Sequence, residues 1–576
     1  MAIKPKTRPW YFGNTTVRSP FRLRDGLSAI STSSLQGDLR GVQQDKAFRE
    51  LLGAAGIVKL GEDKTNSVGR KWRAAMSQHG FLYPEIPAAS GLHQADIGAV
   101  DTITPNGWRL IRAETVAGMQ ECFLRSLAAY YIPNVLDGGY TFTAVFSPLR
   151  HTLAIMLELE RQTGSSTLDI FEMAVIVQFS NATQPLPSIV GEILDLRARR
   201  GAAVNKRQFF RQEIDAAVAR YGYVATSFKD YADLNFRYLK ATGLFQSKGR
   251  GISLLPEKHL FSEQLVADAA IPADDLKIIR SMCEGAELPT DNADTARTVL
   301  DDLVAQLRQR GVEFELAGRP ITEVGDINLI RHEAEDKLFA LNEAEYAAQQ
   351  AQQWQEIVAW MDLLIANSNH PVILPTGEPI QVPSGEAPAY FEWVIWRAFL
   401  AINSLVNPPN DARKFKIDQD FLPVGTAPGG GPDLIFEFDE FVLVVEVTLT
   451  TNSRQEAAEG EPVRRHVANA VLDYQATGKR VYGLFLANKI DSNTAETFRF
   501  GVWYLPDDSR MQLDIVPMPL SQFKELFVAM FQCKKVDKAH IAEIISRCRV
   551  LHEHEPPIWK AKIAEQIAAY SAELGN

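Results

Sequence analysis

Two acidic residues stand in stretches that otherwise have the pattern of buried strands, within GGGPDLIFEFDEFVLVVEVTLT (429–450). Asp433 heads one apolar run and Glu446 lies inside the next. If residues 439–440 form a two-residue turn, the runs pair as an antiparallel hairpin with Asp433 directly opposite Glu446. Opposed residues in such a ladder have Cβ atoms about 5 Å apart. Two carboxylates at that distance repel each other unless a cation lies between them, so the pattern predicts a divalent metal site with oxygen ligands.

A third carboxylate is predicted to reach the same place from a helix. The stretch AYFEWVIWRAFLAI (389–402) has helical periodicity, and Glu392 shares its apolar stripe with Trp396 and Phe399. A carboxylate on that stripe is aimed at the interior, where an unpaired charge is costly. The alternative is a glutamate at the edge of the stripe whose carboxylate reaches water.

A fourth carboxylate, Glu459, follows the hairpin. It stands just before a helix that Pro462 can start, PVRRHVANAVLDY. Glu459 either joins the other acids or is a helix N-terminal acid favoured by the helix dipole. On the same helix we interpret His466 as a half-buried packing histidine rather than a catalytic base. Arg464 and Arg465 face either phosphate or solvent.

The composition is that of a globular protein with several domains. The chain has 576 residues, of which 46% are hydrophobic and 23% charged. Its four cysteines form no CxxC pair, which excludes a disulfide framework or a zinc site. We find no stretch of 18 uninterrupted apolar residues and no signal-peptide pattern at the N-terminus. We therefore expect a cytoplasmic protein that does not enter the membrane.

The charge is distributed unevenly along the chain. The net charge is −11, yet residues 1–80 contain 14 Lys or Arg against 6 Asp or Glu, a surplus of +8. The stretches KPKTRPW and VRSPFRLR are the densest parts of this surplus. A basic region indicates a nucleic-acid contact, and a solvated basic face is the alternative.

Two segments have the outline of a winged helix-turn-helix, whose helix can enter a major groove. Residues 68–84 predict a helix, and residues 102–111 predict a glycine-bearing wing after it. The same order is predicted in 230–258, where a helix is followed by the basic loop 247–250 and a short strand. A small packing unit without a ligand is the alternative for each segment.

These patterns predict a multidomain fold that combines α/β and α+β parts. We expect a winged-helix-like DNA-recognition region at 1–285 and a helical connector at 286–375. An α/β domain at 376–535 would carry the acids, and a helical segment at 536–576 would close the chain.

The acids and their spacing resemble a known nuclease signature. Pro-Asp, twelve residues and Glu-Val-Thr resembles PD-(D/E)XK, in which an Asp and a Glu on adjacent strands hold Mg²⁺. Thr448 stands where that signature usually has Lys. With Glu392 and Glu459, the pattern resembles the cleavage domain of AlwI-type type IIS restriction endonucleases and their nicking relatives. The opening block RPWYFGNTTVRSPFRL (8–23) also resembles the opening of that family, and the resemblance runs from residue 8 to about 530.

The resemblance implies a role for each acid. Asp433 and Glu446 would be the metal ligands, for Mg²⁺ with Mn²⁺ expected to substitute. Glu392 would complete or orient the site, and Glu459 would be the additional acid after the second strand. Thr448 leaves the general base undefined, because a hydroxyl cannot take a proton as a neutral lysine does. The nucleophile would then be a water activated by the metal.

The resemblance implies double-stranded DNA as the substrate, cut a few base pairs from a short asymmetric site. A transient homodimer for double-strand cleavage stays open, and the family implies a cognate DNA methyltransferase. The alternatives are a strand-specific nickase and a non-catalytic DNA-binding regulator on a nuclease-like scaffold. Seven basic residues are the candidate DNA contacts, to phosphate more than to bases: Arg18, Arg22, Arg24, Lys71, Arg73, Lys248 and Arg250.

Overall fold

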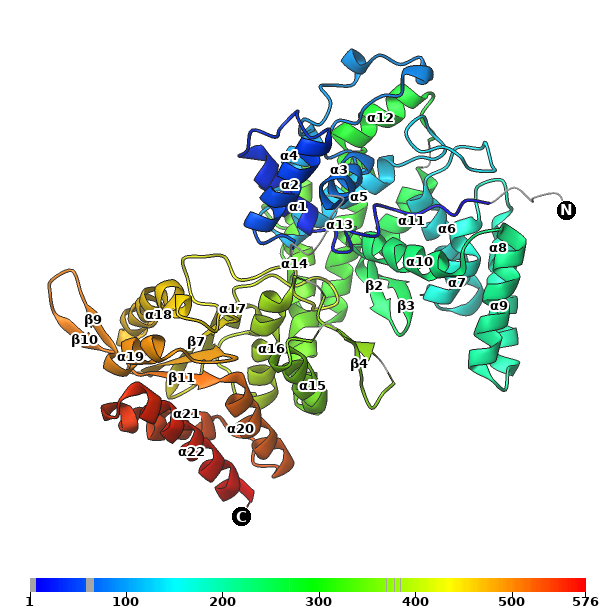
Figure 1. Ribbon diagram of the computed structural model, residues 1–576. Coiled ribbons are helices and arrows are strands. Elements are labelled where there is room, and N and C mark those ends of the chain that lie inside the picture. The colour runs from blue at the N-terminus through cyan, green and yellow to red at the C-terminus, as the bar shows by residue number, and fades with distance from the viewer. Residues whose placement is uncertain are drawn as a thin grey trace. The chain divides into compact units, whose positions relative to one another are not determined.

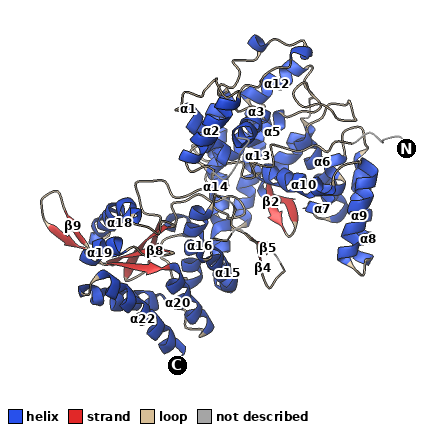
Figure 2. Cartoon of the chain, in the orientation of Figure 1, coloured by secondary structure: helices blue, strands red, loops and turns tan. Residues whose placement is uncertain are grey.

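The computed structural model describes residues 7–58, 67–268, 270–368, 370–377, 379–383 and 385–575. It is mixed, with many helices and a few short sheets (Figure 1, Figure 2). The chain divides into two compact units, unit 1 (residues 1–337) and unit 2 (residues 338–576). The division into four regions stays a prediction. Lys4 and Lys6 of the basic N-terminus lie outside the described residues.

Unit 1 is built mainly of helices. They are α1 (Arg22–Ser31), α2 (Val42–Ala54), α3 (Ser67–Gln78), α4 (Pro105–Arg112), α5 (Val116–Ala129), α6 (Pro148–Thr163), α7 (Ile170–Val175), α8 (Leu186–Ala202), α9 (Lys206–Tyr221), α10 (Ala225–Lys240), α11 (His259–Ala267), α12 (Asp275–Glu284), α13 (Ala293–Gln309) and the start of α14 (Val324–Gln349). One antiparallel sheet joins β1 (Leu168–Asp169), β3 (Gly251–Leu254) and β2 (Phe245–Lys248), in that order.

The helix and basic hairpin predicted at 230–258 are confirmed. α10 is followed by the β2–β3 hairpin, in which Ser247 pairs with Ile252. Lys248 and Arg250 flank Gly249, whose φ of +55° suits glycine at the turn. The hairpin therefore presents its basic residues at its tip.

The wing predicted at 102–111 is wrong, because residues 105–112 form helix α4. Thr104 is its N-cap and accepts a hydrogen bond from the backbone N–H of Gly107, and Pro105 occupies the first turn. Threonine at the N-cap followed by proline is a strong helix start. The prediction gave Gly107 a turn role and overlooked this start.

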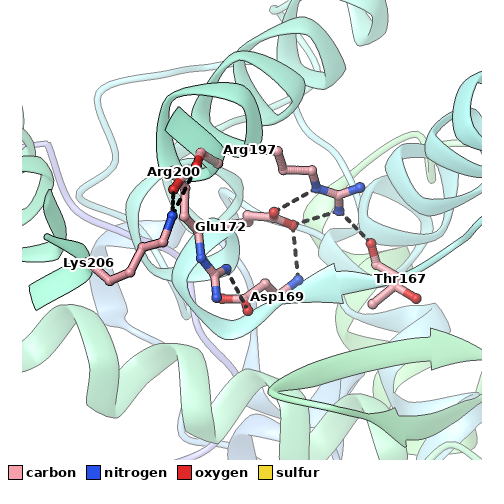
Figure 3. Close-up of a pocket in the computed structure, with 7 residues that line it drawn as sticks. Thr167, Asp169, Glu172, Arg197, Arg200 and Lys206 are labelled. Atoms are coloured by element: carbon pink, nitrogen blue, oxygen red, sulfur yellow. Dashed lines mark hydrogen bonds and ion pairs between the residues drawn. The ribbon is translucent and has the colours of Figure 1, made fainter. Parts of the chain in front are cut away.

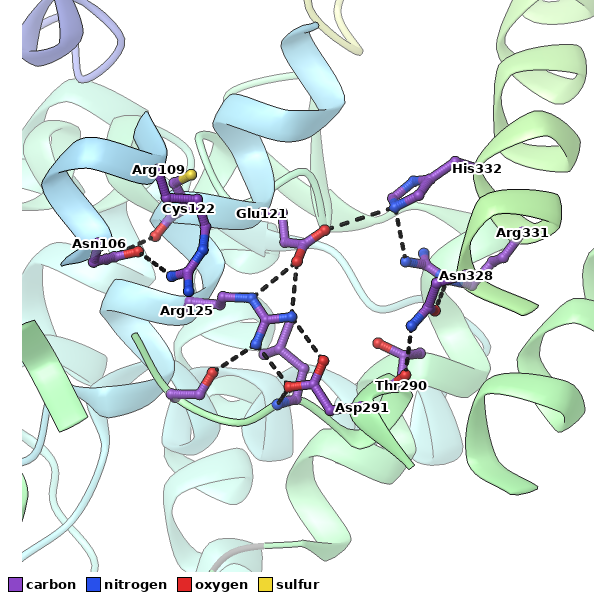
Figure 4. A network of polar contacts seen from close by, with 12 residues as sticks. Asn106, Arg109, Glu121, Cys122, Arg125, Thr290, Asp291, Asn328, Arg331 and His332 are labelled. Carbon is purple, nitrogen blue, oxygen red and sulfur yellow. Dashed lines mark hydrogen bonds and ion pairs between the residues drawn. The ribbon is translucent and has the colours of Figure 1, made fainter. Parts of the chain in front are cut away.

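A polar network joins α5 to the segments that follow residue 285 (Figure 4). Arg125 donates 2.7 Å hydrogen bonds to both carboxylate oxygens of Asp291. Asn328 of α14 donates to the carbonyl of Thr290 at 2.8 Å, and Arg331 donates to Asn328. Residues on both sides of the boundary predicted at 285 thus share one hydrogen-bonded network. Unit 1 itself continues to residue 337.

Unit 2 is built around one mixed four-stranded sheet, whose strand order is β11-β8-β7-β6. Its helices are α15 (Trp354–Ile365), α16 (Ala387–Ile402), α17 (Pro409–Ala412), α18 (Arg454–Asp473), α19 (Ser492–Phe500), α20 (Leu520–Gln532), α21 (Lys538–Val550) and α22 (Pro556–Gly575). Its strands are β4 (Val372–Ile373), β5 (Pro379–Ile380), β6 (Leu434–Glu437), β7 (Phe441–Thr448), β8 (Arg480–Ala487), β9 (Val502–Tyr504), β10 (Arg510–Gln512) and β11 (Ile515–Pro519). β6 and β7 are antiparallel, whereas β8 is parallel to β7 and β11.

The predicted hairpin register is confirmed. Leu434 pairs with Val445 and Glu437 with Val442, as the two-residue turn requires. The turn closes with a 2.8 Å hydrogen bond from the Phe438 N–H to the carbonyl of Phe441. One step beyond the ladder, this register places Asp433 opposite Glu446.

Helices cover both faces of this sheet. On one face Phe399 of α16 stacks on Phe436 of β6, with ring centroids 4.3 Å apart. On the other face the ring of Phe498 of α19 lies 5.1 Å from that of Phe485, which pairs with Glu446. The continuous apolar run of β7 follows from this double coverage, as in other buried parallel strands.

A buried arginine fixes α16, the helix that carries Glu392. Arg397 is 2% exposed and donates 2.7 Å hydrogen bonds to Gln350, Gln353 and Glu356. Its guanidinium also lies 4.7 Å from the ring centroid of Trp393. Each donated bond ties α16 to the segment just before α15 or to its first turn.

We predict that Arg397→Met increases local opening of α16. The change leaves buried Gln350 and half-buried Gln353 and Glu356 without their donor, which costs about 1–3 kcal/mol. The matched control is Arg547→Met, which removes an exposed pair with Glu543 and Glu573 worth less than about 1 kcal/mol. Hydrogen exchange of the peptide covering 389–402 measures the difference. Equal protection in the two variants would contradict the role of Arg397.

Candidate active site

Asp433 and Glu446 lie together at the end of the β6–β7 hairpin. The Asp433 carboxylate accepts a 2.9 Å hydrogen bond from the Val447 N–H, which anchors it to β7. Besides burial, the charge of Glu446 raises the pKa of Asp433, so the two carboxyl groups are electrostatically linked. The Glu446 side chain is buried, with 6% of the residue exposed. A pair of this kind titrates as one unit.

Glu392 approaches the same place from α16. It is 4% exposed, so the predicted inward orientation is confirmed and the alternative at the edge of the stripe is wrong. Its Oε2 accepts a 2.7 Å hydrogen bond from the N–H of Ala427. Glu392 therefore holds the loop that leads into Asp433 and adds a third carboxyl group to the site.

Glu459 lies inside α18 and not ahead of a helix. The expected start at Pro462 is wrong, because α18 begins at Arg454 and contains Pro462. Asn452 accepts from the Arg454 N–H, and buried Gln455 binds the carbonyl of Lys489 at 3.0 Å. These contacts fix the first turn to the ends of β7 and β8, so the helix starts two turns before the proline.

Thr448 is buried beside Glu459. Its hydroxyl accepts a hydrogen bond from the Thr450 N–H at 3.2 Å, and its polar contact lowers the pKa of Glu459 against the rise caused by burial. The residue two beyond Glu446 thus faces the acids, as the strand alternation predicts.

His466 is the residue whose role the sequence interpretation missed. Its Nδ1 lies 2.6 Å from Oε1 of Glu446, and the residue is 7% exposed. Its Nε2 is buried and has no hydrogen-bond partner among the described residues. Its place on the apolar stripe of α18, facing the strand of Glu446, was the available signal.

All five predicted catalytic residues line one cavity of about 660 Å³. The loop Gly429–Gly431 forms part of its wall, and a Cβ added to any of these glycines would meet no atom within 4 Å. Only Gly430, with φ of +103°, needs glycine for its backbone conformation. Among the described lining residues, Arg465 and His466 are the basic ones.

Burial and mutual repulsion keep protons in this cavity. Burial raises the pKa of Glu392, and the charge of Asp433 adds to the effect. Burial and then the charge of Glu446 raise the pKa of Asp433, and burial raises that of Glu446 to about 8. Burial likewise raises the pKa of Glu459. Burial and the charge of Arg465 lower the pKa of His466, and the nearby acids Asp433, Glu461 and Glu459 oppose this shift without cancelling it.

The donor set fits a hard divalent cation. Within the part of the chain that the structure describes, no three His, Cys, Asp or Glu side chains converge closely enough to hold a metal ion unaided. Mg²⁺ does not need three, since one or two carboxylates with water and phosphate oxygens are its usual ligands. Asp433 and Glu446 provide two such carboxylates, and their repulsion is what a cation would relieve.

The seven candidate DNA contacts of unit 1 differ in their surroundings. Arg73 is mostly buried beside Asp45, and Arg24 donates to the carbonyl of Ile111. Arg18 is half exposed and lies 3.4 Å from Asp230. The remaining contacts are Arg22, which donates to the Gly56 carbonyl, half-buried Lys71, and Lys248 and Arg250 at the exposed hairpin tip. Arg73 and Arg24 are thus committed to internal contacts.

A family model of the AlwI restriction endonuclease matches residues 77–526, more than three quarters of the chain. The chain belongs to the AlwI restriction endonuclease family. It is accordingly a DNA endonuclease. All four acids and Thr448 lie within the matched residues, whereas the opening block at 8–23 lies ahead of them.

Two solved structures resemble parts of this family member. The small subunit of the heterodimeric restriction endonuclease R.BspD6I is 23% identical, and the match covers 38% of this chain and 98% of that one, with a TM-score of 0.27. The BpuJ1 endonuclease binding domain, in complex with pyrene- and phenanthrene-modified DNA, is 12% identical, with 50% and 99% coverage and a TM-score of 0.32. No match was found among curated proteins. No helix among the described residues is long and apolar enough to cross a membrane.

We predict that the metal-free endonuclease loses stability between about pH 5 and pH 8. The folded-state pKa values of Asp433 and Glu446 lie above their unfolded values, so the folded state binds more protons in that range. The stabilisation is present below the unfolded pKa and is lost as pH rises through the folded pKa.

Asp433→Asn should reduce the pH-dependent decrease in the free energy of unfolding by on the order of 2 kcal/mol. Thermal melts in EDTA measure this change. Asp439→Asn is the matched control, because Lys538 lowers the pKa of that exposed carboxylate on the same hairpin. A wild-type slope in Asp433→Asn would show that the cluster is not where the protons are held.

Proposed function

We propose that this chain is a Mg²⁺-dependent type IIS endonuclease, with Mn²⁺ able to substitute. It would bind a short asymmetric site in double-stranded DNA and hydrolyse phosphodiester bonds a few base pairs away, leaving 5′-phosphate and 3′-hydroxyl ends. One observation carries the proposal. Four carboxyl groups from separate parts of unit 2, Glu392, Asp433, Glu446 and Glu459, face one cavity of about 660 Å³.

Asp433 and Glu446 are the proposed cation ligands. A bound divalent cation supplies charge stabilisation at the phosphate and lowers the pKa of a water. The Val447 N–H holds the Asp433 carboxylate, and His466 holds the Glu446 carboxylate. Both ligands are therefore fixed before a cation arrives, which limits the reorganisation during the reaction.

Thr448 occupies the position where the PD-(D/E)XK signature usually has a lysine that can accept a proton. Its polar contact with Glu459 assigns it the role of orienting that acid. Glu459 is then the acid best supported as proton acceptor, because burial raises its pKa. His466 is assigned a positioning role through Nδ1, since its Nε2 is buried.

Arg465 is the proposed phosphate contact inside the cavity. It lines the cavity and pairs with Glu461 at 3.0 Å, while 36% of its side chain stays exposed. Arg464 instead donates to the carbonyls of Gly460 and Val502, so its role is structural. The open loop Gly429–Gly431 leaves room for the DNA backbone next to Asp433.

DNA recognition is assigned to unit 1, where the basic hairpin tip lies. A transient homodimer for double-strand cleavage and a cognate DNA methyltransferase belong to this proposal, both implied by the family. A strand-specific nickase would use the same residues. A non-catalytic regulator is the second candidate, favoured by Thr448 in the lysine position.

Incubation of the full chain with supercoiled plasmid and Mg²⁺ separates these functions. Linear product supports double-strand cleavage, and nicked circles support the nickase. A gel shift without cleavage supports the regulator. Sequencing the product ends then gives the recognition site and the cut positions.

We predict that Asp433→Ala abolishes cleavage and preserves DNA binding. The change removes a proposed cation ligand, and the loss should reach at least on the order of 10²–10³-fold. Asp439→Ala, six residues further along the hairpin, is the matched control and should cleave normally. Wild-type cleavage by Asp433→Ala would place the metal site elsewhere.

We predict that His466→Ala lowers the cleavage rate by roughly 10–100-fold, because Glu446 loses its orienting partner. His466→Asn can keep a hydrogen-bond donor near the position of Nδ1 and should recover most of the rate. If both variants are equally slow, Nε2 takes part in proton transfer and the positioning role is wrong.

A further inference from the structure

Unit 1 contains a second basic segment that the sequence analysis did not single out. Residues 197–211, RARRGAAVNKRQFFR, contain six Arg or Lys and no Asp or Glu. The chain as a whole has a net charge of −11, so this segment departs strongly from its surroundings. It covers the last turns of α8 and the first turns of α9.

The six basic residues gather at the closed end of a helical hairpin. Arg199 of α8 pairs with Glu213 of α9, and Glu192 of α8 pairs with Arg220. The later residue of α8 pairs with the earlier residue of α9, so the two helices run antiparallel. Figure 1 shows them side by side. Asn205 in the short connection caps α9 by accepting from the Gln208 N–H. The hairpin therefore concentrates positive charge at its tip.

Ion pairs attach this tip to the small sheet of unit 1 (Figure 3). Arg197 donates to both carboxylate oxygens of Glu172 at 2.7 and 2.8 Å, and Arg200 lies 3.1 Å from Asp169. Asp169 pairs with Gly251 at the start of β3. A Cβ on Gly251 would lie 2.0 Å from the carbonyl oxygen of Leu168, so only glycine permits this approach. The basic turn of the β2–β3 hairpin is thereby brought to the helical tip.

One aromatic ring organises arginines from both segments. The guanidinium of Arg200 lies 5.1 Å from the ring centroid of Phe210, and that of Arg250 lies 5.4 Å from it. Phe171 holds this ring edge-on, with centroids 4.7 Å apart. Each cation–π contact stabilises by roughly 0.5–1 kcal/mol at such an exposed site. Phe210 thus helps to order Arg250, together with Arg200, which also pairs with Asp169.

Positive charge remains after the internal ion pairs are counted. Asp169 and Glu172 are matched by Arg200 and Arg197, which line a cavity of about 400 Å³. Arg199 is matched by Asp195 and Glu213. The structure places no acidic side chain of the described ranges in an ion pair with the other five cations. They are the exposed residues Lys206, Arg207, Arg211, Lys248 and Arg250.

We propose that this basic tip surface, formed by residues 197–211 and 248–250, binds the phosphate backbone of duplex DNA. The proposal rests on the DNA endonuclease function. An array of fixed cations without acidic partners suits a polyanion, and its contacts release condensed counterions. Such contacts position the enzyme on DNA and carry no sequence information. The surface therefore sets affinity and salt dependence, while base recognition lies elsewhere.

The test compares two double variants of the full chain. Arg207→Gln/Arg211→Gln removes two cations from the surface. Lys277→Gln/Arg308→Gln removes two exposed cations of α12 and α13 and is the matched control. Binding to a duplex of arbitrary sequence of about 30 base pairs is measured by fluorescence anisotropy in EDTA, between about 50 and 200 mM salt.

The surface variant should have a log K against log salt slope shallower by roughly 1.8, since each phosphate contact contributes about 0.9. The control should keep the wild-type slope. On a plasmid fragment that the wild type cleaves, the surface variant should lose affinity by the same factor as on arbitrary DNA. Equal slopes for both double variants overturn the proposal, and so does a loss confined to the cleaved fragment.

Phe210 is a positioning residue, and its conservative variant tests that role. Phe210→Leu leaves the charge unchanged but removes the ring under Arg200 and Arg250, so affinity should fall and the salt slope should flatten. Phe210→Tyr keeps the ring and should restore both. A thermal melt checks that each variant is folded, and a folded Phe210→Leu with wild-type binding overturns the role of the ring.

Failure of this inference is distinguishable from failure of the proposed function. Plasmid cleavage by the wild type with Mg²⁺ tests the function alone. A wild type that cleaves, together with surface variants that bind normally, rejects only the basic tip surface.

Discussion

Repulsion between buried carboxyl groups is the constraint on which unit 2 depends. Four acids face one cavity, and burial raises the pKa of each. Three of the acids have a fixed hydrogen-bond partner: the Ala427 N–H for Glu392, the Val447 N–H for Asp433 and His466 for Glu446. Two of these partners are uncharged backbone groups, and burial lowers the pKa of His466. They therefore orient the acids and leave their charge for a cation to neutralise.

The scaffold supplies the rigidity that such a cluster needs. The antiparallel pairing of β6 with β7 sets Asp433 opposite Glu446, and helices on both faces of the sheet hold that register. Arg397 fixes α16, and Gln455 fixes the start of α18. The helices that bear Glu392 and His466 are therefore anchored independently of the site. A site held in this way loses little free energy to reorganisation when its cation binds.

Unit 1 gathers positive charges, and it accommodates their repulsion differently from the acids of unit 2. The cations of the basic tip surface stay exposed or half-exposed, where water screens them, and Phe210 contacts Arg200 and Arg250 without adding a negative charge. The negative net charge of the chain gives no indication of this surface, because repulsion and attraction depend on where charges lie. A protein of acidic composition can therefore present a local surface suited to DNA.

The sequence alone determined the parts that depend on local pattern. A two-residue turn and strand alternation are enough to place Asp433 opposite Glu446, and helical periodicity is enough to turn Glu392 inward. Only the tertiary structure decided the contacts between distant segments. It showed that α18 begins before Pro462 and that His466 binds Glu446. It also brought Arg200 and Arg250 to one ring, because pairing between β1 and β3 joins segments about 80 residues apart, a separation that no local periodicity encodes.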